Sequence, residues 1–285
     1  MKESDENTAE LRSVCPPEAL SAFISVFVCR KDRVDADVVR LLPELRSSVQ
    51  VSLADPYWVR EREDRAPWRR CPEIALWTPR TVWGYGHAKC DIKVYAFGLT
   101  PLGLKTLLRG TRVVEPNHVY DLSCDPELRY LRDDAGQCSF DDWCSITSDR
   151  LGRVFRDVDS VPAISDEALA VLSTDGGGAV AAASELMRLS TRQFRRRFAA
   201  AFGMSPKRYQ KLARVDRMIR QLHPRAWESD AFAAMPVAFA DQPHAIREFK
   251  EATGITPAAY VAKKAAGDLT LRSLTIESGV KSPVE

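Results

Sequence analysis

Two stretches in the C-terminal half of the sequence repeat each other at a fixed distance of 51 residues. FAAAFGMSPKRY (198–209) corresponds to FKEATGITPAAY (249–260), and the agreement includes glycine and proline, which punctuate secondary structure. A repeat of this period indicates a duplicated supersecondary unit. Six pairs share the offset: Arg196 with Arg247, Phe198 with Phe249, Gly203 with Gly254, Ser205 with Thr256, Pro206 with Pro257, and Tyr209 with Tyr260.

Each copy contains one helix that ends and a second helix that begins. The glycine stands at the C′ position that terminates a helix, and the Ser-Pro or Thr-Pro that follows supplies an N-cap and a proline in the first turn. Ser190 and Asp241 are placed to cap the helices that precede the glycines. The pattern predicts helices over Thr191–Phe202, Lys207–Leu222 and Gln242–Thr253.

The first copy has the pattern of a helix-turn-helix. A helix of small residues over Val180–Met187 is followed by a tight turn at Arg188–Ser190 and by helix Thr191–Phe202. Two short helices joined by such a turn can place the second one in the DNA major groove. At about 100° per residue, the inward face holds Phe194, Phe198 and Ala201, and the opposite face holds Arg192, Arg195 and Arg196.

The second copy follows the same plan. Helix Lys207–Leu222 between the copies would be about 24 Å long at 1.5 Å per residue, on the scale needed to hold two recognition helices about one DNA turn apart. A plain helical bundle with a basic surface is the alternative interpretation. In helix Gln242–Thr253 the inward residues are Ala245, Phe249 and Ala252, and the outward ones are Pro243, Ile246, Arg247 and Lys250.

The formal net charge of +2 is the sum of two unlike parts. Residues 185–225 hold twelve basic and two acidic residues, a charge of +10, which leaves −8 for the rest of the chain. Clustered arginine and lysine are the electrostatic footprint of a surface that binds a polyanion. A solvated helix face is the alternative explanation of such a charge run.

The first half of the chain has a different composition. All seven cysteines and five of the six tryptophans lie within residues 1–144. The cysteines form no CxxC pair, and only His87 and His118 accompany them, so free thiols are expected rather than a zinc site. The N-terminus is polar, so no secretory signal is expected, and no apolar stretch has the length of a membrane span.

Short apolar runs in this half predict strands, because proline, glycine and aspartate separate them. They are FISVFV (23–28), VQVSLA (49–54), EIALW (73–77) and IKVYAFGL (92–99). A short helix is predicted at LKTLLRG (104–110), and a connecting helix between Asp125 and Asp159. The predicted fold class is α+β. The predicted order is a flexible leader (1–14), a β-rich domain with the connecting helix (15–160), an all-α domain with two helix-turn-helix units (161–265) and a flexible tail (266–285), in which LTLRSLTI (269–276) could pair as a strand.

Four runs carry a resemblance to a known family: LSTRQFRRRF (189–198), GMSPKRY (203–209), FADQPHAIREF (239–249) and GITPAAY (254–260). With these runs, residues 165–262 resemble the DNA-binding domain of AraC/XylS-type transcriptional regulators. The resemblance implies a seven-helix fold with two helix-turn-helix units. It also implies that both recognition helices enter successive major grooves on one face of the DNA.

The N-terminal half is similar to a cupin-like domain that precedes such DNA-binding domains in some bacterial regulators. That resemblance implies a role in sensing or dimerisation. It is carried by LPE (42–44), VQVSLADP (49–56), TPRT (78–81) and FGLTPLGLKTLL (97–108).

The second helix-turn-helix departs from the family pattern. Pro236 falls inside its first helix, where proline costs about 3 kcal/mol, and Ala238 replaces a glycine. Asp230 stands where an apolar residue is usual, and Pro243 stands early in the recognition helix. These departures predict that the second unit reads bases less fully than the first. The first unit departs at Arg188, where the turn commonly has glycine.

The candidate DNA-binding residues follow from side-chain chemistry. Arginine pairs with both O6 and N7 of guanine, glutamine can read adenine, and isoleucine can touch a thymine methyl group. We therefore expect base or adjacent phosphate contacts from Arg192, Arg195 and Arg196 in the first unit and from Gln242, Ile246 and Arg247 in the second. Phosphate contacts are expected from Lys207, Arg208 and Lys250. Arg214, Arg217 and Arg220 are either further contacts or solvent-facing spacer residues.

The expected function is sequence-specific DNA binding by a transcription regulator of the AraC type. No nucleophile elbow, Walker loop or HExxH site occurs, so we expect no enzyme, catalytic residue, cofactor or metal. The expected partners are double-stranded DNA, a second copy bound through the N-terminal domain, a small-molecule effector and RNA polymerase. The expected location is the bacterial cytoplasm, at the nucleoid when DNA is bound. The alternative is an effector- or thiol-sensing protein that has a degenerate second helix-turn-helix and acts through protein partners.

Overall fold

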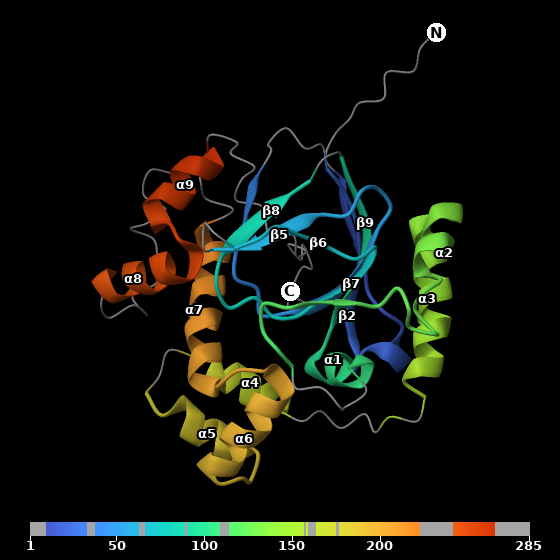
Figure 1. Cartoon of the computed structure of the whole chain (residues 1–285). Helices are drawn as coiled ribbons and strands as arrows, with labels where there is room; N and C mark the ends of the chain where they lie inside the picture. The colour runs from blue at the N-terminus through green and yellow to red at the C-terminus, as the bar shows by residue number, and fades with distance from the viewer. Residues whose placement is uncertain are drawn as a thin grey trace.

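The computed structural model shows a β-rich N-terminal region followed by a helical C-terminal region, as the sequence predicts (Figure 1). The two regions differ in which elements supply their cores. Strands dominate up to residue 121, and beyond it the described chain is helical. The described residues are 10–32, 38–62, 66–88, 91–108, 114–156, 158, 164–174, 177–222 and 242–265.

The strands form two antiparallel sheets. In spatial order, the larger sheet contains β1 (Glu10–Val14), β2 (Ile24–Asp32), β9 (Ile92–Leu99), β4 (Ser47–Ser52), β7 (Ile74–Trp77) and β10 (Val119–Asp121). The smaller sheet contains β3 (Val39–Leu41), β8 (Gly84–His87), β5 (Trp58–Glu61) and β6 (Arg69–Arg70).

All four apolar runs that predict strands contain one, namely β2, β4, β7 and β9. The prediction of a loose leader is wrong for residues 10–14, because they form β1 and pair with β2 from Glu10 opposite Lys31 to Val14 opposite Phe27. This edge strand is short and mostly polar, and its stability comes from backbone pairing that composition does not reveal.

The alternation of side chains along β9 separates two hydrophobic cores. Tyr95, Phe97 and Leu99 point to one face and are buried in the core that the N-terminal helices cover. Val94 and Ala96 point to the other face, where they pack with residues of the smaller sheet. Because both faces are covered, β9 reads as an almost continuous apolar run.

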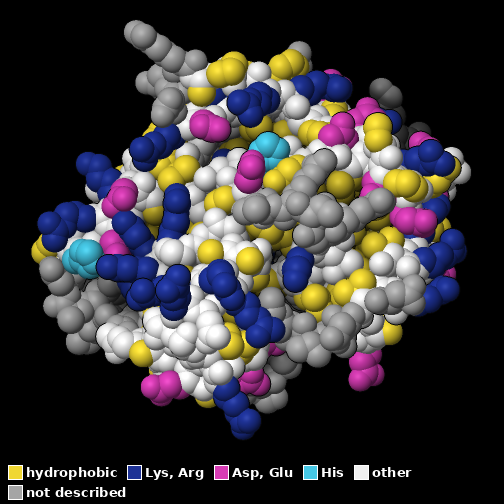
Figure 2. All heavy atoms as spheres, turned by 60° about the horizontal axis from the view of Figure 1, so that its bottom comes forward, with side chains coloured by type: hydrophobic (Ala, Val, Ile, Leu, Met, Phe, Trp, Pro, Cys, Tyr) yellow, Lys and Arg dark blue, Asp and Glu magenta, His cyan; other side chains and the backbone are white. Residues whose placement is uncertain are grey.

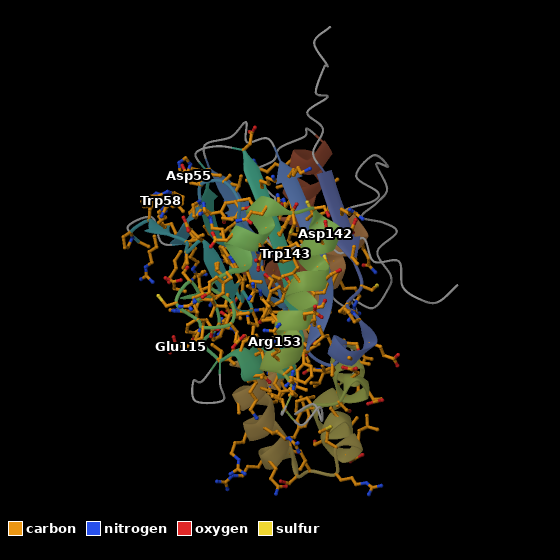
Figure 3. All side chains as sticks on the ribbon, turned by 90° about the vertical axis from the view of Figure 1, so that its right-hand side faces the viewer. Asp55, Trp58, Glu115, Asp142, Trp143 and Arg153 are labelled. Atoms are coloured by element: carbon orange, nitrogen blue, oxygen red, sulfur yellow. The ribbon has the colours of Figure 1, made fainter. Side chains whose placement is uncertain are left out.

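Helices cover the outer face of the larger sheet. They are α1 (Pro101–Leu107), α2 (Leu131–Gln137) and α3 (Phe140–Val154), with a short 3-10 helix η1 (Glu18–Leu20) beside them. Figure 3 looks onto α3, which carries Asp142, Trp143 and Arg153 along its length. Trp143 is fully buried, and its indole Nε1 donates to the carbonyl oxygen of Leu131 at 3.0 Å. A helix is present where one was predicted at 104–110, but α1 begins earlier, at Pro101, and ends at Leu107, whereas α3 confirms the connecting helix.

The C-terminal helices lie to the left of and below the β-rich body, away from α2 and α3 at its right (Figure 1). They are α4 (Asp166–Leu172), α5 (Ala179–Leu186), α6 (Thr191–Phe202), α7 (Pro206–Leu222), α8 (Gln242–Thr253) and α9 (Pro257–Ala265). The predicted bounds of α6 and α8 are confirmed, and α5 and α7 each begin one residue before the predicted start. Pro236, Ala238, Asp230, Asp241, Gly110 and the tail from 266 lie outside the described residues.

Two hydrophobic cores divide these helices. The first contains Phe194 and Phe198 of α6 together with residues of α4 and α5, and the second contains Phe249 of α8 and Tyr260 of α9. Helix α7 contributes to both, with Leu212 in the first and Val215 and Met218 among those in the second. Helix α7 is therefore shared by two units, of which the structure describes α4, α5 and α6 in the first and α8 and α9 in the second.

Candidate nucleic-acid interface

The turn between α5 and α6 contains a backbone conformation that residues other than glycine rarely adopt. Arg188 has a φ of 52°, in the left-handed region. The turn closes through hydrogen bonds from the amide of Arg188 to the carbonyl of Glu185 and from the amide of Leu189 to the carbonyl of Ser184, both at 2.9 Å. A non-glycine residue pays about 1–2 kcal/mol in this conformation. The departure seen in the sequence at Arg188 is thus a site of backbone strain.

Helix α6 begins at a complete capping box. The amide of Gln193 donates to Ser190 Oγ at 3.3 Å, and the amide of Ser190 donates to Gln193 Oε1 at 3.0 Å. This reciprocal pair satisfies two amides that no helical carbonyl can reach. The predicted role of Ser190 as N-cap is confirmed, and the cap fixes where the exposed face of α6 begins.

The three candidate arginines of the first unit lie on the exposed face of α6. Arg192, Arg195 and Arg196 are all exposed, and they form no ion pair with any residue that the structure describes. The opposite face is buried, since Phe194 and Phe198 have no exposed surface. The structure therefore brings these arginines together on one accessible surface.

Helix α8 exposes a smaller positive face. Pro243, Arg247 and Lys250 are exposed, and Ile246 is half-buried. Gln242 is the first residue of α8, and its side chain is not among those described. Ala245, Phe249 and Ala252 are buried, as predicted.

The repeat seen in the sequence is also a repeat of aromatic packing. The rings of Phe198 and Tyr209 meet edge to face with centroids 5.3 Å apart, and those of Phe249 and Tyr260 do so at 5.9 Å. The glycines that end α6 and α8 both adopt left-handed φ angles, 66° at Gly203 and 78° at Gly254. Each unit thus ends its recognition helix and starts the next helix in the same way.

Two of the basic residues on α7 are structural. Arg214 makes a two-pronged ion pair with Glu248 of α8, through Nε at 3.0 Å and Nη2 at 2.7 Å. Arg217 donates a hydrogen bond to the carbonyl oxygen of Ser173, next to α4. These contacts attach α7 to both units. The sequence left open whether Arg214 and Arg217 contact DNA or face solvent, and in the structure both bind other parts of the protein. The side chain of Arg220 is not described.

The candidate phosphate contacts divide in the same way. Lys207 and Lys250 are exposed, whereas the Arg208 guanidinium donates from Nη2 to Thr81 Oγ1 of the N-terminal region at 2.7 Å. Figure 2 shows lysine and arginine side chains gathered on the left half of the face that it presents, on the side where Figure 1 places α7 and α8. Of these three residues, Arg208 is already engaged within the protein.

The C-terminal ends of both recognition helices rest on the N-terminal region. The Trp83 amide donates to the carbonyl of Ala252 at 3.0 Å, and Arg40 Nη1 donates to that of Thr253 at 3.3 Å. At the end of α6, a Cβ on Gly203 would collide with the backbone carbonyl of Val114. The N-terminal ends of recognition helices are the parts that contact base edges in DNA complexes.

One short segment of the N-terminal region enters both units, and we call residues 41–46 the docking segment. Leu42 is buried in the core of the second unit beside Phe249, and Leu45 packs against the core of the first. In the sequence, residues 42–44 served only as part of a family resemblance, and their contact with the helices was not predicted. The docking segment couples the β-rich region to both helix-turn-helix units.

The thiols near the cores are protonated and packed. Burial raises the pKa of Cys71 to about 12 and that of Cys144 to about 12. The six cysteines that the structure describes form no disulfide with one another. Within the described residues, no group of three or more His, Cys, Asp or Glu could hold a metal ion, and no helix has the length and apolarity to cross a membrane.

Comparison with known proteins identifies the helical region. The sequence profile of a family described as "Helix-turn-helix domain" matches residues 183–263. A search of curated proteins finds no match. Among solved structures, a 1.65 Å structure of ToxT from Vibrio cholerae is 12% identical with a TM-score of 0.47, over 83% of this chain and 98% of that one. ToxT with a bound unsaturated fatty acid is 10% identical with a TM-score of 0.44, over 82% and 94%. Residues 183–263 of this chain are therefore similar to a family of helix-turn-helix domains.

Proposed function

We propose that this protein is a transcription regulator that binds double-stranded DNA in a sequence-specific way through α6 and α8. The observation that carries the proposal is the exposed face of α6, where Arg192, Arg195 and Arg196 follow a capped helix-turn-helix turn. A buried aromatic face holds this helix against its own unit, so its outer face is free to meet a ligand. The matched family profile supports the same function.

The chemistry of this face suits the major groove. Arginine can donate to both O6 and N7 of guanine, which discriminates against a wrong base by about 1–3 kcal/mol. Lys207 in the first turn of α7 and Lys250 on α8 are exposed, and phosphate contacts from them would orient the protein without reading sequence. Exposed arginines on α6 therefore carry specificity, and these lysines carry affinity.

The second unit contributes less direct readout. Arg247 and Ile246 occupy the outer face of α8, but Pro243 lies in its first turn and offers no hydrogen bond to a base. Helix α7 has 17 residues, or about 25 Å at 1.5 Å per residue, and joins the units. We propose that α6 and α8 enter successive major grooves, with the first unit dominating recognition.

The N-terminal region would supply regulation. It touches the ends of both recognition helices and both helical cores, so a small effector bound there has a direct route to the DNA-binding surface. We further propose that this region mediates a homodimer, and that RNA polymerase is a partner at the promoter. The thiol-sensing alternative draws little support from Cys71 and Cys144, since burial keeps these thiols protonated and weakly nucleophilic.

The proposal is tested by mapping the genomic sites that the full-length protein occupies and measuring its affinity for one of them at increasing salt. Affinity for the mapped site should fall linearly on a log–log plot, with a slope of about −0.9 for each phosphate neutralised. A scrambled site of the same length and composition is the control. No enriched sites, together with equal affinity for both DNAs, would overturn sequence-specific binding.

A further inference from the structure

A cavity of about 420 Å³ opens in the β-rich region, away from the helix-turn-helix units. It is lined by strands β5 and β6, by the residues that follow β7 and by those around the start of β10. Cavities of this size hold small organic molecules. No proposed role in DNA binding uses it, so its contents must be argued from its lining.

Arg80 lines this cavity, and among the residues that the structure describes none accepts a hydrogen bond from its guanidinium. The side chain is half-buried, contacts the face of Trp77 at 5.8 Å from the ring centroid and donates no hydrogen bond to any described residue. Burial is the largest influence on the group and lowers the pKa of Arg80 to about 10, although Cys71 and Glu61 act in the opposite direction. Guanidinium groups carry five donors, and leaving them without acceptors in a partly buried site is costly.

The backbone around Arg80 leaves room for this guanidinium. A Cβ on Gly84 would lie 2.8 Å from the carbonyl oxygen of Arg60 and 3.1 Å from Arg80 Nη1, so the lack of a side chain at Gly84 leaves space for both the Arg60 backbone and the Arg80 guanidinium. Asn117 also lines the cavity, and its φ of 62° places it in the left-handed region that asparagine tolerates best after glycine. The site is built around the cation.

The rest of the lining has an excess of positive charge. Arg60, Arg69 and Arg70 line the same cavity, and its acidic residues are Glu61 and Asp121. Arg60 is stacked over the rings of Trp68 and Tyr85, at 5.0 and 4.8 Å from their centroids, which fixes its side chain. Four arginines thus face two carboxylates. Such a cavity attracts anions.

We propose that the cavity binds a small organic anion whose carboxylate or phosphate group is held by Arg80. Arginine presents paired donors that match two oxygens of such a group. Val59, Pro67 and Val119 supply an apolar wall for the remainder of the molecule. The bound oxyanion supplies acceptors that the described part of the chain does not, and it offsets the cost of burying the charge.

The backbone of Arg80 links the site to the docking segment. The Glu44 amide donates to the Arg80 carbonyl at 2.9 Å, and the Arg80 amide donates to the Glu44 carbonyl at 2.7 Å. Glu44 stands between Leu42 and Leu45, which pack into the second and first units. A shift of Arg80 on binding would therefore be transmitted to both units.

A second route leaves the cavity through Asn117. The Thr81 amide donates to Asn117 Oδ1 at 2.7 Å, and Thr81 Oγ1 accepts from Arg208 at the start of α7. The anion would thus act on the attachment of α7 as well as on the docking segment. This consequence for DNA binding rests on the proposed function, whereas anion binding itself does not.

The test titrates the full-length protein with benzoate and, separately, with inorganic phosphate, at constant ionic strength and without DNA. Thermal stability and tryptophan fluorescence are the readouts, because Trp77 and Trp68 contact arginines of the cavity. At least one anion should raise the melting temperature and change the fluorescence saturably, whereas neutral benzamide should not. Benzoate alone would assign a carboxylate ligand, and phosphate alone a phosphorylated one.

Variants locate the site. Arg80→Gln should raise the half-saturating anion concentration at least about tenfold, as expected for the loss of a charge-assisted hydrogen bond. The matched control is Arg153→Gln, an exposed arginine on α3 that does not line the cavity (Figure 3). Arg80→Lys keeps the charge but loses the paired donors, so its half-saturating anion concentration should lie between those of wild type and Arg80→Gln. If Arg80→Gln does not fold, Arg80→Lys provides the test in its place.

Two outcomes overturn the proposal: neither anion has a saturable effect on the wild-type protein, or the Arg80 variants bind the anion as tightly as wild type does. The coupling is tested by measuring wild-type affinity for DNA with and without the saturating anion. Absence of any DNA binding would overturn the proposed function and leave the anion site standing. Equal DNA affinity with and without the anion would overturn the coupling alone.

Discussion

The two helix-turn-helix units share one sequence pattern but are completed differently. In the first unit, α4, α5 and α6 bury Phe194 and Phe198 largely among themselves. The second unit buries Phe249 with the help of Leu42, which comes from the β-rich region. Among the described residues, the first core receives only the partly buried Leu45 from the docking segment, whereas the second core includes the buried Leu42, about 200 residues earlier in the chain than Phe249.

The exposed charges of the two units also differ, in how many of them are paired within the protein. Helix α6 presents arginines without described ion-pair partners, whereas on α7 and α8 several charges pair with one another: Glu248 accepts from Arg214 and lies 3.2 Å from His244, and Lys211 pairs with Glu251 at 2.7 Å. Charges that are paired within the protein are less available to phosphate. We therefore propose that the first unit is the main site of recognition and that the second also serves to attach the helical region to the N-terminal region.

The largest expected effect tests this dependence. Leu42→Ala should destabilise the protein by about 2–5 kcal/mol, because it removes a buried side chain and leaves a cavity beside Phe249. Leu45→Ala is the matched variant and should cost less, since Leu45 is only partly buried against the first unit. Urea unfolding of both measures the difference, and hydrogen exchange should show loss of protection in α8 for Leu42→Ala. If the two variants were destabilised equally, the second unit would depend on the N-terminal region no more than the first does.

The next effect concerns recognition. Arg196→Ala should weaken binding to a mapped site by more than about tenfold, because it removes a donor pair from α6. The equivalent change in the second unit, Arg247→Ala, should weaken binding less. Affinities are measured at one fixed salt concentration, with circular dichroism to verify folding and Arg153→Ala as the control. If Arg247→Ala costs more than Arg196→Ala, the assignment of recognition to the first unit is wrong.

A smaller effect comes from the strained turn. Arg188→Gly should stabilise the first unit by about 1 kcal/mol, because glycine adopts the left-handed conformation without a Cβ clash. The matched control is Arg192→Gly in α6, where glycine should destabilise by about 1 kcal/mol. Thermal unfolding distinguishes the two. If Arg188→Gly lowered the stability, the contacts of the arginine side chain would contribute more to the free energy of unfolding than the left-handed backbone of Arg188 costs.

The smallest effect is a pH dependence in the second unit. The hydrogen bond from Lys211, followed by its charge, lowers the pKa of Glu251. A carboxylate with a lowered folded-state pKa stabilises the protein above its unfolded-state pKa, and this contribution disappears as the pH falls through the folded-state value. Because Glu251 is mostly exposed, Glu251→Gln should cost at most about 0.5 kcal/mol at neutral pH. The cost should vanish in acid, and a cost that persists there would show that the ion pair is not its source.

The helices of both units could be predicted closely because their signals are local. Ser190, Gly203 and Pro206 mark where α6 ends and α7 begins, and the apolar stripe of α6 fixes its buried face. The four apolar strands were predictable for the same reason. Strand β1 was not, since its stability comes from its pairing with β2.

The contacts between the regions could not be predicted from local pattern. Nothing in the neighbourhood of Arg208 indicates that it donates to Thr81, and the sequence argument placed it on phosphate. Arg80 was noted only as part of a family motif, because its importance depends on burial in a cavity assembled from distant strands. Contacts of this kind depend on how folded parts dock, which no periodicity encodes.

The docking segment has a consequence for the DNA sequences that the protein can tolerate. Because residues 41–46 pack against both helical cores, and α7 is attached to both units, the recognition helices cannot slide apart independently. The protein should therefore measure the distance between its half-sites as strictly as it reads their bases. Inserting five base pairs between them would turn the second half-site to the opposite face of the duplex, and we expect a promoter altered in this way to escape control although both half-sites are intact.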